Sequence, residues 1–160
     1  MPELVFSQRP ISRTFRLPSL EAALPELDKL RRSSQILLSP GWDLPHTLDH
    51  CARSIEHAML GFPVQKNIVF QTLVGSTVFH LFDALGFMRH NLSEEIPGDI
   101  FAPPLPSLHA AIERLEGSIR TFLEYQGTLS PHFTYGSLSK GQYDRANALH
   151  IANHLDAMEY

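Results

Sequence analysis

Apolar residues recur at steps of three and four along much of the chain, the spacing that gathers side chains on one face of a helix. The regularity is greatest in residues 106–127, which end at Gly127, a typical helix stop. The apolar positions there are Leu108, Ile112, Leu115, Ile119 and Phe122. The pattern predicts a helix with one face in the core.

Two more helices have recognisable starts. Asp43 is a typical N-cap, so a helix is predicted over residues 43–60. Ser139 and Gln142 have the spacing of a capping box, in which two side chains bond reciprocally to the backbone at a helix start. The final helix is therefore predicted to run through residues 143–159, to the end of the chain.

Two further segments are less regular. Residues 19–32 repeat leucine and alanine at helical spacing, and Pro25 within them indicates a kink or a late start. Residues 67–87 contain many β-branched side chains, but about twenty positions of apolar character in succession favour a buried helix over strands. Gly75 and Ser76 would allow close packing in that helix.

These four or five helices, with no convincing alternating strand pattern, predict an all-α fold, a helical bundle forming one domain over residues 19–160. Residues 1–18 contain three prolines and are predicted to form an extended N-terminal arm. Residues 88–106 form a long proline-rich loop. Loops of this length are either lids over a binding site or plain linkers.

Composition limits the choice of partners. The net charge is −4 and no Lys/Arg cluster is longer than KLRR, so no nucleic-acid partner is expected. The sequence contains no evident signal segment, and the apolar residues 67–87 are expected to form a core helix, so no membrane partner is expected. The single cysteine, Cys51, excludes an internal disulfide. Together these features predict a cytoplasmic protein.

Several catalytic motifs are missing from the sequence. It contains no pair of Glu-x-x-His motifs, no His-Glu-x-x-His and no Gly-x-Ser-x-Gly. Histidine is the remaining candidate, because nine histidines include two pairs at a four-residue step, His46/His50 and His150/His154. About half of one such pair is expected by chance in a chain of this composition, so the spacing alone is a weak signal.

The faces of two helices carry more information than the spacing. The polar row on the last predicted helix consists of Tyr143, Asn147, His150 and His154. Two imidazoles on one helix face can point at one ion. On the helix over residues 43–60, Thr47, His50 and Ser54 form a strip of polar side chains that can border a cavity.

A family resemblance adds to this picture. GWDLPHTLDHC, residues 41–51, resembles the helix opening of the DinB-like (DinB/YfiT-like) superfamily, in which a metal-ligating histidine follows a tryptophan by eight positions, as His50 follows Trp42. ALHIANHL, residues 148–155, resembles the closing His-x3-His helix of that superfamily. PHFTYGSLSKGQYDRANALHIANHLDAM and SIEHAMLGFP resemble an uncharacterised DinB-related branch, a domain of unknown function. The resemblance extends over residues 19–158.

The resemblance implies a four-helix bundle in which His50, His150 and His154 bind one divalent metal ion, commonly zinc or nickel, with water at the open positions. Characterised relatives include thiol-dependent S-transferases and an isomerase that use low-molecular-weight thiols such as bacillithiol or mycothiol. The resemblance therefore implies a small-molecule substrate, a thiol partner and a homodimer.

The leading hypothesis is a metal-dependent thiol transferase whose substrate enters beside residues 88–106. In the alternatives, the histidines are hydrogen-bonded core residues, the ion only staples two helices, or the bundle is a non-catalytic module that binds a small molecule or a partner helix. Whether the protein is an enzyme stays open at this point. Candidates for contacting substrate or supporting the ligands are Tyr143, Asn147, Thr47, Ser54, Tyr135 and His132. Cys51 is expected to be a small buried hydrophobe.

Overall fold

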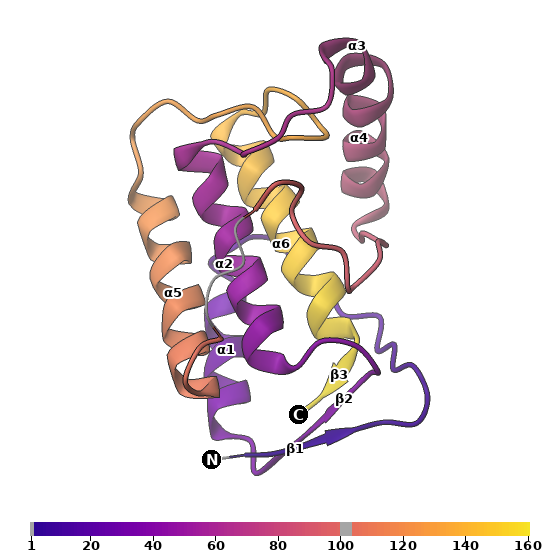
Figure 1. The fold of residues 1–160 in the computed structure, drawn as a ribbon, viewed down its shortest axis with the longest axis vertical. Helices are drawn as coiled ribbons and strands as arrows, with labels where there is room; N and C mark the ends of the chain where they lie inside the picture. The colour runs from indigo at the N-terminus through magenta and orange to yellow at the C-terminus, as the bar shows by residue number, and fades with distance from the viewer. Residues whose placement is uncertain (1, 100–103) are drawn as a thin grey trace.

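The computed structural model describes residues 2–99 and 104–160, and Figure 1 shows their helices side by side above a small sheet. The helices are α1 (Ala23–Arg32), α2 (Leu44–Leu60), α5 (Leu108–Glu124), α6 (Lys140–Asp156) and a continuous segment made of α3 (Ile68–Phe70), the π-helical turn η1 (Gln71–Gly75) and α4 (Ser76–Leu85). The strands are β1 (Glu3–Phe6), β2 (Gln35–Leu38) and β3 (Met158–Glu159). Because α2 packs against both α5 and α6, it is the central helix.

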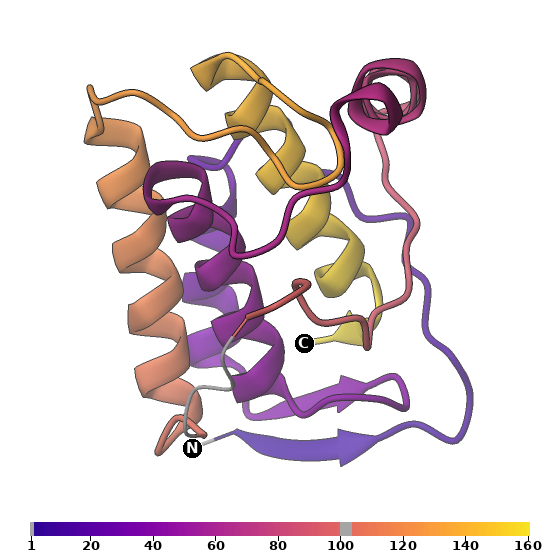
Figure 2. The same ribbon diagram turned by 45° about the horizontal axis from the view of Figure 1, so that its top comes forward.

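The three strands form a mixed sheet at one end of the helices (Figure 2). β1 pairs in parallel with β2, and β2 pairs antiparallel with β3. The prediction of an all-α four-helix bundle is therefore wrong, and the fold is mixed α/β. None of the described strands is longer than four residues, which is too short for a recognisable period of two.

The N-terminal arm is tied to the end of the last helix. β1 lies within the arm, and beyond it Ser12 Oγ and the backbone N–H of Phe15 donate to the carboxylate of Asp156, at 2.9 and 2.7 Å. Arg89, in the loop after α4, donates to the same carboxylate at 2.7 Å. The buried Asp156 therefore joins the arm, this loop and α6.

The starts of α2 and α6 follow their local sequence signals. The side chain of Asp43 accepts the backbone N–H three residues later at 2.8 Å, and α2 occupies the predicted residues. Ser139 and Gln142 make both bonds of the capping box, at 2.9 and 3.2 Å. The helix ends earlier than predicted, at Asp156, because the residues beyond it pair with β2.

The core is one cluster of apolar side chains contributed mainly by α1, α2, α5 and α6. α1 begins at Ala23, so Pro25 lies in its first turn and the late start replaces a kink. Cys51 is 1% exposed in this cluster, as expected for a buried hydrophobe. Burial raises the pKa of its thiol, which argues against a nucleophilic role.

The helical segment from α3 to α4 is mostly exposed, contrary to the prediction that it is buried. Only 17% of its 18 residues are buried, and by length and composition alone it could cross a membrane. Within this segment, α4 is the part that lies beside α6 (Figure 1). Its exposed large apolar side chains are Ile68, Val69, Leu73, Val74, Leu81 and Leu85. An apolar sequence shows that a face avoids polar groups, but not whether another element covers it.

Gly75 sets the distance between this helical segment and the loop at residues 132–136. A Cβ at Gly75 would lie 1.9 Å from the carbonyl oxygen of Thr134, so Gly75→Ala must displace backbone. We expect the free energy of unfolding to fall by about 1–3 kcal/mol, as in other overpacked sites. Gly117→Ala in α5 is the matched control, because nothing lies within 4 Å of its added Cβ. Helix propensity predicts that the control gains roughly 0.5–1 kcal/mol. Urea denaturation of both variants checks this, and equal stabilities would contradict the packing argument.

Candidate metal site and pocket

Three histidine side chains meet where α2 packs against α6. His150 Nε2 lies 3.1 Å from His50 Nε2 and 3.2 Å from His154 Nε2, and the three ligand atoms all lie within 4.8 Å of one another. His150 and His154 are one turn apart on α6, and His50 approaches from α2. The structure thus brings together the three residues predicted from the sequence to be ligands.

The three imidazoles are held in the neutral form. Burial, followed by the nearby Arg53, lowers the pKa of His50 to about 3. Burial and the neighbouring histidines lower the pKa of His154 and of the partly exposed His150 well below 6.5. Near pH 7 each ring therefore has a nitrogen lone pair, which is the form that binds a metal ion.

The arrangement fits a divalent metal ion. In a tetrahedral zinc site, Zn–N distances of about 2.0–2.1 Å correspond to nitrogen–nitrogen distances of about 3.3–3.4 Å. The two close distances around His150 are slightly shorter than this. Each neutral imidazole has one nitrogen lone pair, and one cation can accept the lone pairs of all three rings. The residues His50, His150 and His154 could therefore hold a metal ion.

His90, in the loop after α4, is a fourth histidine beside this cluster. Its Nδ1 lies 2.9 Å from the carbonyl oxygen of Asn91 and so donates, which leaves the lone pair on Nε2. That Nε2 is buried and has no hydrogen-bond partner among the described residues. Its ring centre lies 5.0 Å from that of His150 and 5.3 Å from that of His154, similar to the separations within the cluster. No signal in the sequence pointed to His90, because a residue on a loop has no fixed spacing from helical ligands.

Glu95 and Trp42 surround His50. Glu95 Oε1 lies 2.7 Å from His46 Nε2, and Glu95 Oε2 lies 3.7 Å from His50 Nδ1. A carboxylate behind a ligating imidazole fixes its orientation and raises its basicity. The Trp42 ring packs edge-on to His50, with centres 5.1 Å apart. Arg53 holds the segment that carries Glu95, through an ion pair with Asp99.

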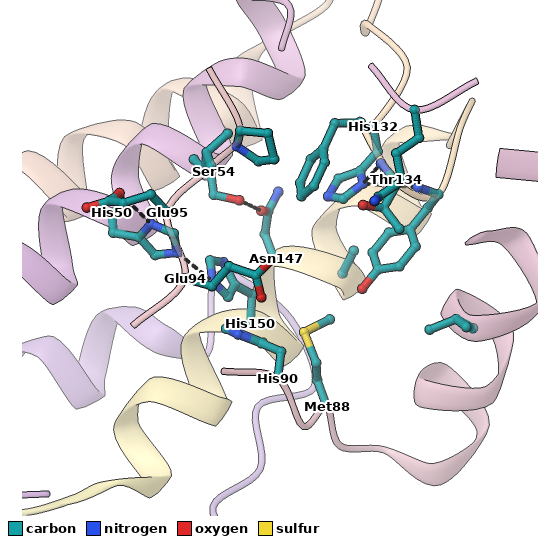
Figure 3. A pocket seen from close by; sticks show the side chains of 17 residues that line it. His50, Ser54, Met88, His90, Glu94, Glu95, His132, Thr134, Asn147 and His150 are labelled. Atoms are coloured by element: carbon teal, nitrogen blue, oxygen red, sulfur yellow. Dashed lines mark hydrogen bonds and ion pairs between the residues drawn. The ribbon is translucent and has the colours of Figure 1, made fainter. Parts of the chain in front are cut away.

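A pocket of about 300 Å³ opens onto the histidine cluster. Its walls come from α2, α6, α4 and the loops that carry residues 88–97 and 132–135, and His50 and His150 line one end (Figure 3). His154 instead lines a separate, smaller cavity of about 30 Å³. The cluster therefore has one face toward a space of ligand size. The predicted long loop contributes to this wall, although its residues 100–103 lie outside the described part of the chain.

The other candidate residues lie in three different places. Ser54, Asn147, His132 and Tyr135 line the large pocket. Thr47 lines the small cavity, and its hydroxyl donates to the carbonyl of Asp43 at 2.9 Å. Tyr143 is buried in the core, and its hydroxyl donates to the carbonyl of Ser130 at 2.7 Å. In the described structure Tyr143 is not part of the pocket lining.

His132 is fixed by its own loop. Its Nδ1 accepts the backbone N–H groups of Thr134 and Tyr135, at 3.1 and 3.2 Å. Its ring stacks on those of Tyr135 and Phe133, with centres 4.3 and 4.6 Å apart. Burial lowers the pKa of His132 to about 3, so the ring stays neutral down to acidic pH.

The fold and the site together define a class, a mixed α/β protein with three histidines that could hold a metal ion beside a pocket. A family model described as Protein of unknown function (DUF1569) matches residues 11–160. The chain therefore belongs to this family. No curated protein and no solved structure matches it.

Burial of His132 makes stability depend on pH. Between pH 6.5 and about 3 the unfolded chain binds a proton at this residue and the folded protein does not, so acidification favours unfolding. One such histidine contributes a slope of up to about 1.4 kcal/mol per pH unit. We expect His132→Phe in chelator-treated protein to flatten the pH dependence by up to one proton, measured by denaturant unfolding from pH 7 to pH 4. The exposed His109→Phe is the control, and an unchanged slope in His132→Phe would refute the burial argument.

Proposed function

We propose that the protein binds one divalent metal ion, zinc or nickel, through His50, His150 and His154 and uses it to act on a small molecule held in the pocket. The observation that carries this proposal is the convergence of three neutral imidazole nitrogens at the end of a pocket of about 300 Å³. A site with three protein ligands and an open position is the arrangement typical of catalytic rather than structural zinc.

The surroundings of the cluster support a reactive site. A metal ion bound there would supply Lewis acidity, which lowers the pKa of a bound water or thiol. Glu95 lies where it can orient His50, and the buried Ile96 and Met88 in the pocket wall limit the access of water. Exclusion of bulk water strengthens each electrostatic interaction inside the pocket.

The substrate class follows from the sequence resemblance. The Trp42–His50 step and the His150/His154 pair resemble the DinB-like superfamily, whose characterised members include thiol-dependent transferases. We therefore assign the protein to that superfamily and propose transfer of a low-molecular-weight thiol, such as bacillithiol or mycothiol, to an electrophile, in the cytoplasm. The pocket offers room for a small electrophile beside His50 and His150.

A second function has a specific observation in its favour. The unpartnered Nε2 of His90 lies beside the cluster, and a fourth protein ligand would close the coordination shell. Closed four-ligand sites are typical of structural ions that contribute folding energy. In this alternative the ion staples α2 to α6 and the pocket binds a small molecule without chemistry.

The ligand assignment predicts the metal content of variants. Untagged protein reconstituted with zinc should hold one equivalent by elemental analysis, and His50→Ala, His150→Ala and His154→Ala should each lose it, because each removes a ligand from a site of three. His109→Ala, on the exposed face of α5, is the control and should retain the ion. A full equivalent retained in all three ligand variants would refute the site.

His90→Ala, measured alongside, separates the two functions. If the shell is open, this variant keeps the zinc affinity and the visible spectrum of the cobalt-substituted protein. If His90 closes the shell, the variant loses at least tenfold in affinity and the cobalt spectrum shifts, since loss of one ligand alters the geometry.

Thiol transfer is the finer prediction. Zinc- or nickel-loaded protein should accelerate the reaction of bacillithiol, mycothiol or glutathione with electrophiles such as monochlorobimane, at least a hundredfold over the same mixture with His50→Ala protein. Fluorescence of the conjugate measures the rate. Failure with every thiol, in protein shown to hold one equivalent of metal, would rule out the transferase and leave the binding module.

A further inference from the structure

The pocket has a second polar region, away from the metal cluster. Figure 3 shows His132 on the opposite side of the pocket from His50, with Asn147 and Ser54 between them. His132 is not one of the three histidines that could hold a metal ion together. The polar atoms of His132 and Asn147 are therefore candidates for binding a ligand in the pocket.

His132 is a fixed hydrogen-bond donor. Because Nδ1 accepts two backbone N–H groups, the ring proton of the neutral tautomer lies on Nε2. Stacking on Tyr135 and Phe133 prevents the ring from turning. The bonds described for this side chain all involve Nδ1, so the Nε2–H of a pocket-lining residue is available to a ligand.

Asn147 is a second donor in the same pocket. Its Oδ1 accepts the hydroxyl of Ser54 at 3.4 Å, which assigns the amide nitrogen to the other side. Asn147 is 4% exposed, and its Nδ2 is buried with no hydrogen-bond partner among the described residues. A buried amide without an acceptor costs about 1–3 kcal/mol, which a ligand oxygen would recover.

The charges and apolar groups of the pocket determine which other chemical features a ligand must have. The acidic side chains Glu94 and Glu95 line it together with His50, at the side opposite His132 (Figure 3). Val78, Met88 and Phe133 give the remaining wall its apolar surface. A ligand that suits both donors and this wall has an apolar body and an oxygen that only accepts hydrogen bonds.

We propose that the pocket recognises a small carbonyl compound, whose oxygen accepts hydrogen bonds from Asn147 Nδ2 and His132 Nε2 and whose apolar body packs on the wall formed by Val78, Met88 and Phe133. The recognition deepens the proposed function and rests on it, because the ligand then lies beside the open face of the metal cluster. A carbonyl held in this way is an electrophile presented to that face.

Acetophenone and ethylbenzene form a matched pair of probes that differ in the carbonyl oxygen. Titration into ¹⁵N-labelled wild-type protein should shift the side-chain signals of Asn147 and the Nε2–H signal of His132 with acetophenone. We expect acetophenone to bind about tenfold more tightly, the effect of one to two hydrogen bonds. Equal affinities for the two probes would overturn the proposal without any variant.

Variants then locate the effect. Asn147→Leu and His132→Phe should each reduce the preference for acetophenone at least threefold, while ethylbenzene binding stays the same. Asn153→Leu is the matched control, because Asn153 is a buried asparagine of α6 with an unpartnered Nδ2 outside the described pocket lining. Loss of the preference in the control to the same extent would contradict the assignment.

The titrations are run with and without zinc, so that the two proposals fail separately. If the wild-type protein binds no zinc but still prefers acetophenone, the recognition site is supported and the proposed metal function is refuted. One equivalent of zinc with no carbonyl preference refutes the recognition site and leaves the metal function standing.

Discussion

The organisation of this protein depends on three neutral imidazoles that face one another at the contact between α2 and α6. Their Nε2 atoms are separated by 3.1 and 3.2 Å around His150, in a region where burial opposes protonation. Protonation would relieve the crowding of lone pairs, but a charged ring is costly in this buried region. A divalent cation could bind all three nitrogens, so the helix contact and the candidate metal site coincide.

The elements around this contact set its position. The Asp43 cap and the Ser139 capping box fix where α2 and α6 begin, and therefore which residues of each helix meet. The buried Arg53 pairs with Asp49 on its own helix and with Asp99 in the long loop. Breaking such a pair would leave a buried charge without compensation, so the loop that forms one wall of the pocket is held in place.

Some of the buried polar atoms without hydrogen-bond partners lie near the cluster. Among the described residues they include His90 Nε2 and Asn147 Nδ2, and both residues line the large pocket. Buried polar groups are paired in most folded proteins, so a group of unpaired ones marks a place where stability has been given up. The arrangement is consistent with a site whose remaining partners are an ion and a ligand. The exposed apolar face of the helical segment from α3 to α4 is a separate feature.

The sequence by itself determined the features that depend on neighbours along the chain. The caps at Asp43 and Ser139 and the common face of His150 and His154 follow from three or four residues each, because a helix has a fixed geometry. The helix face placed His50 on a polar strip that can border a cavity, but a motif resemblance was needed to select it as a ligand. Its contact with the other two was decided by the packing of α2 on α6.

Only the tertiary structure decided the remaining features. The strands are too short to show a period of two, and they exist because their backbone groups pair across the fold. The segment from α3 to α4 has the composition of a core helix, yet no other described element covers its outer face. His90 and His132 reach the pocket from loops, and a loop has no period from which a direction can be read. Local rules determine on which face of its own helix a side chain lies. Whether distant residues meet depends on how the whole chain packs.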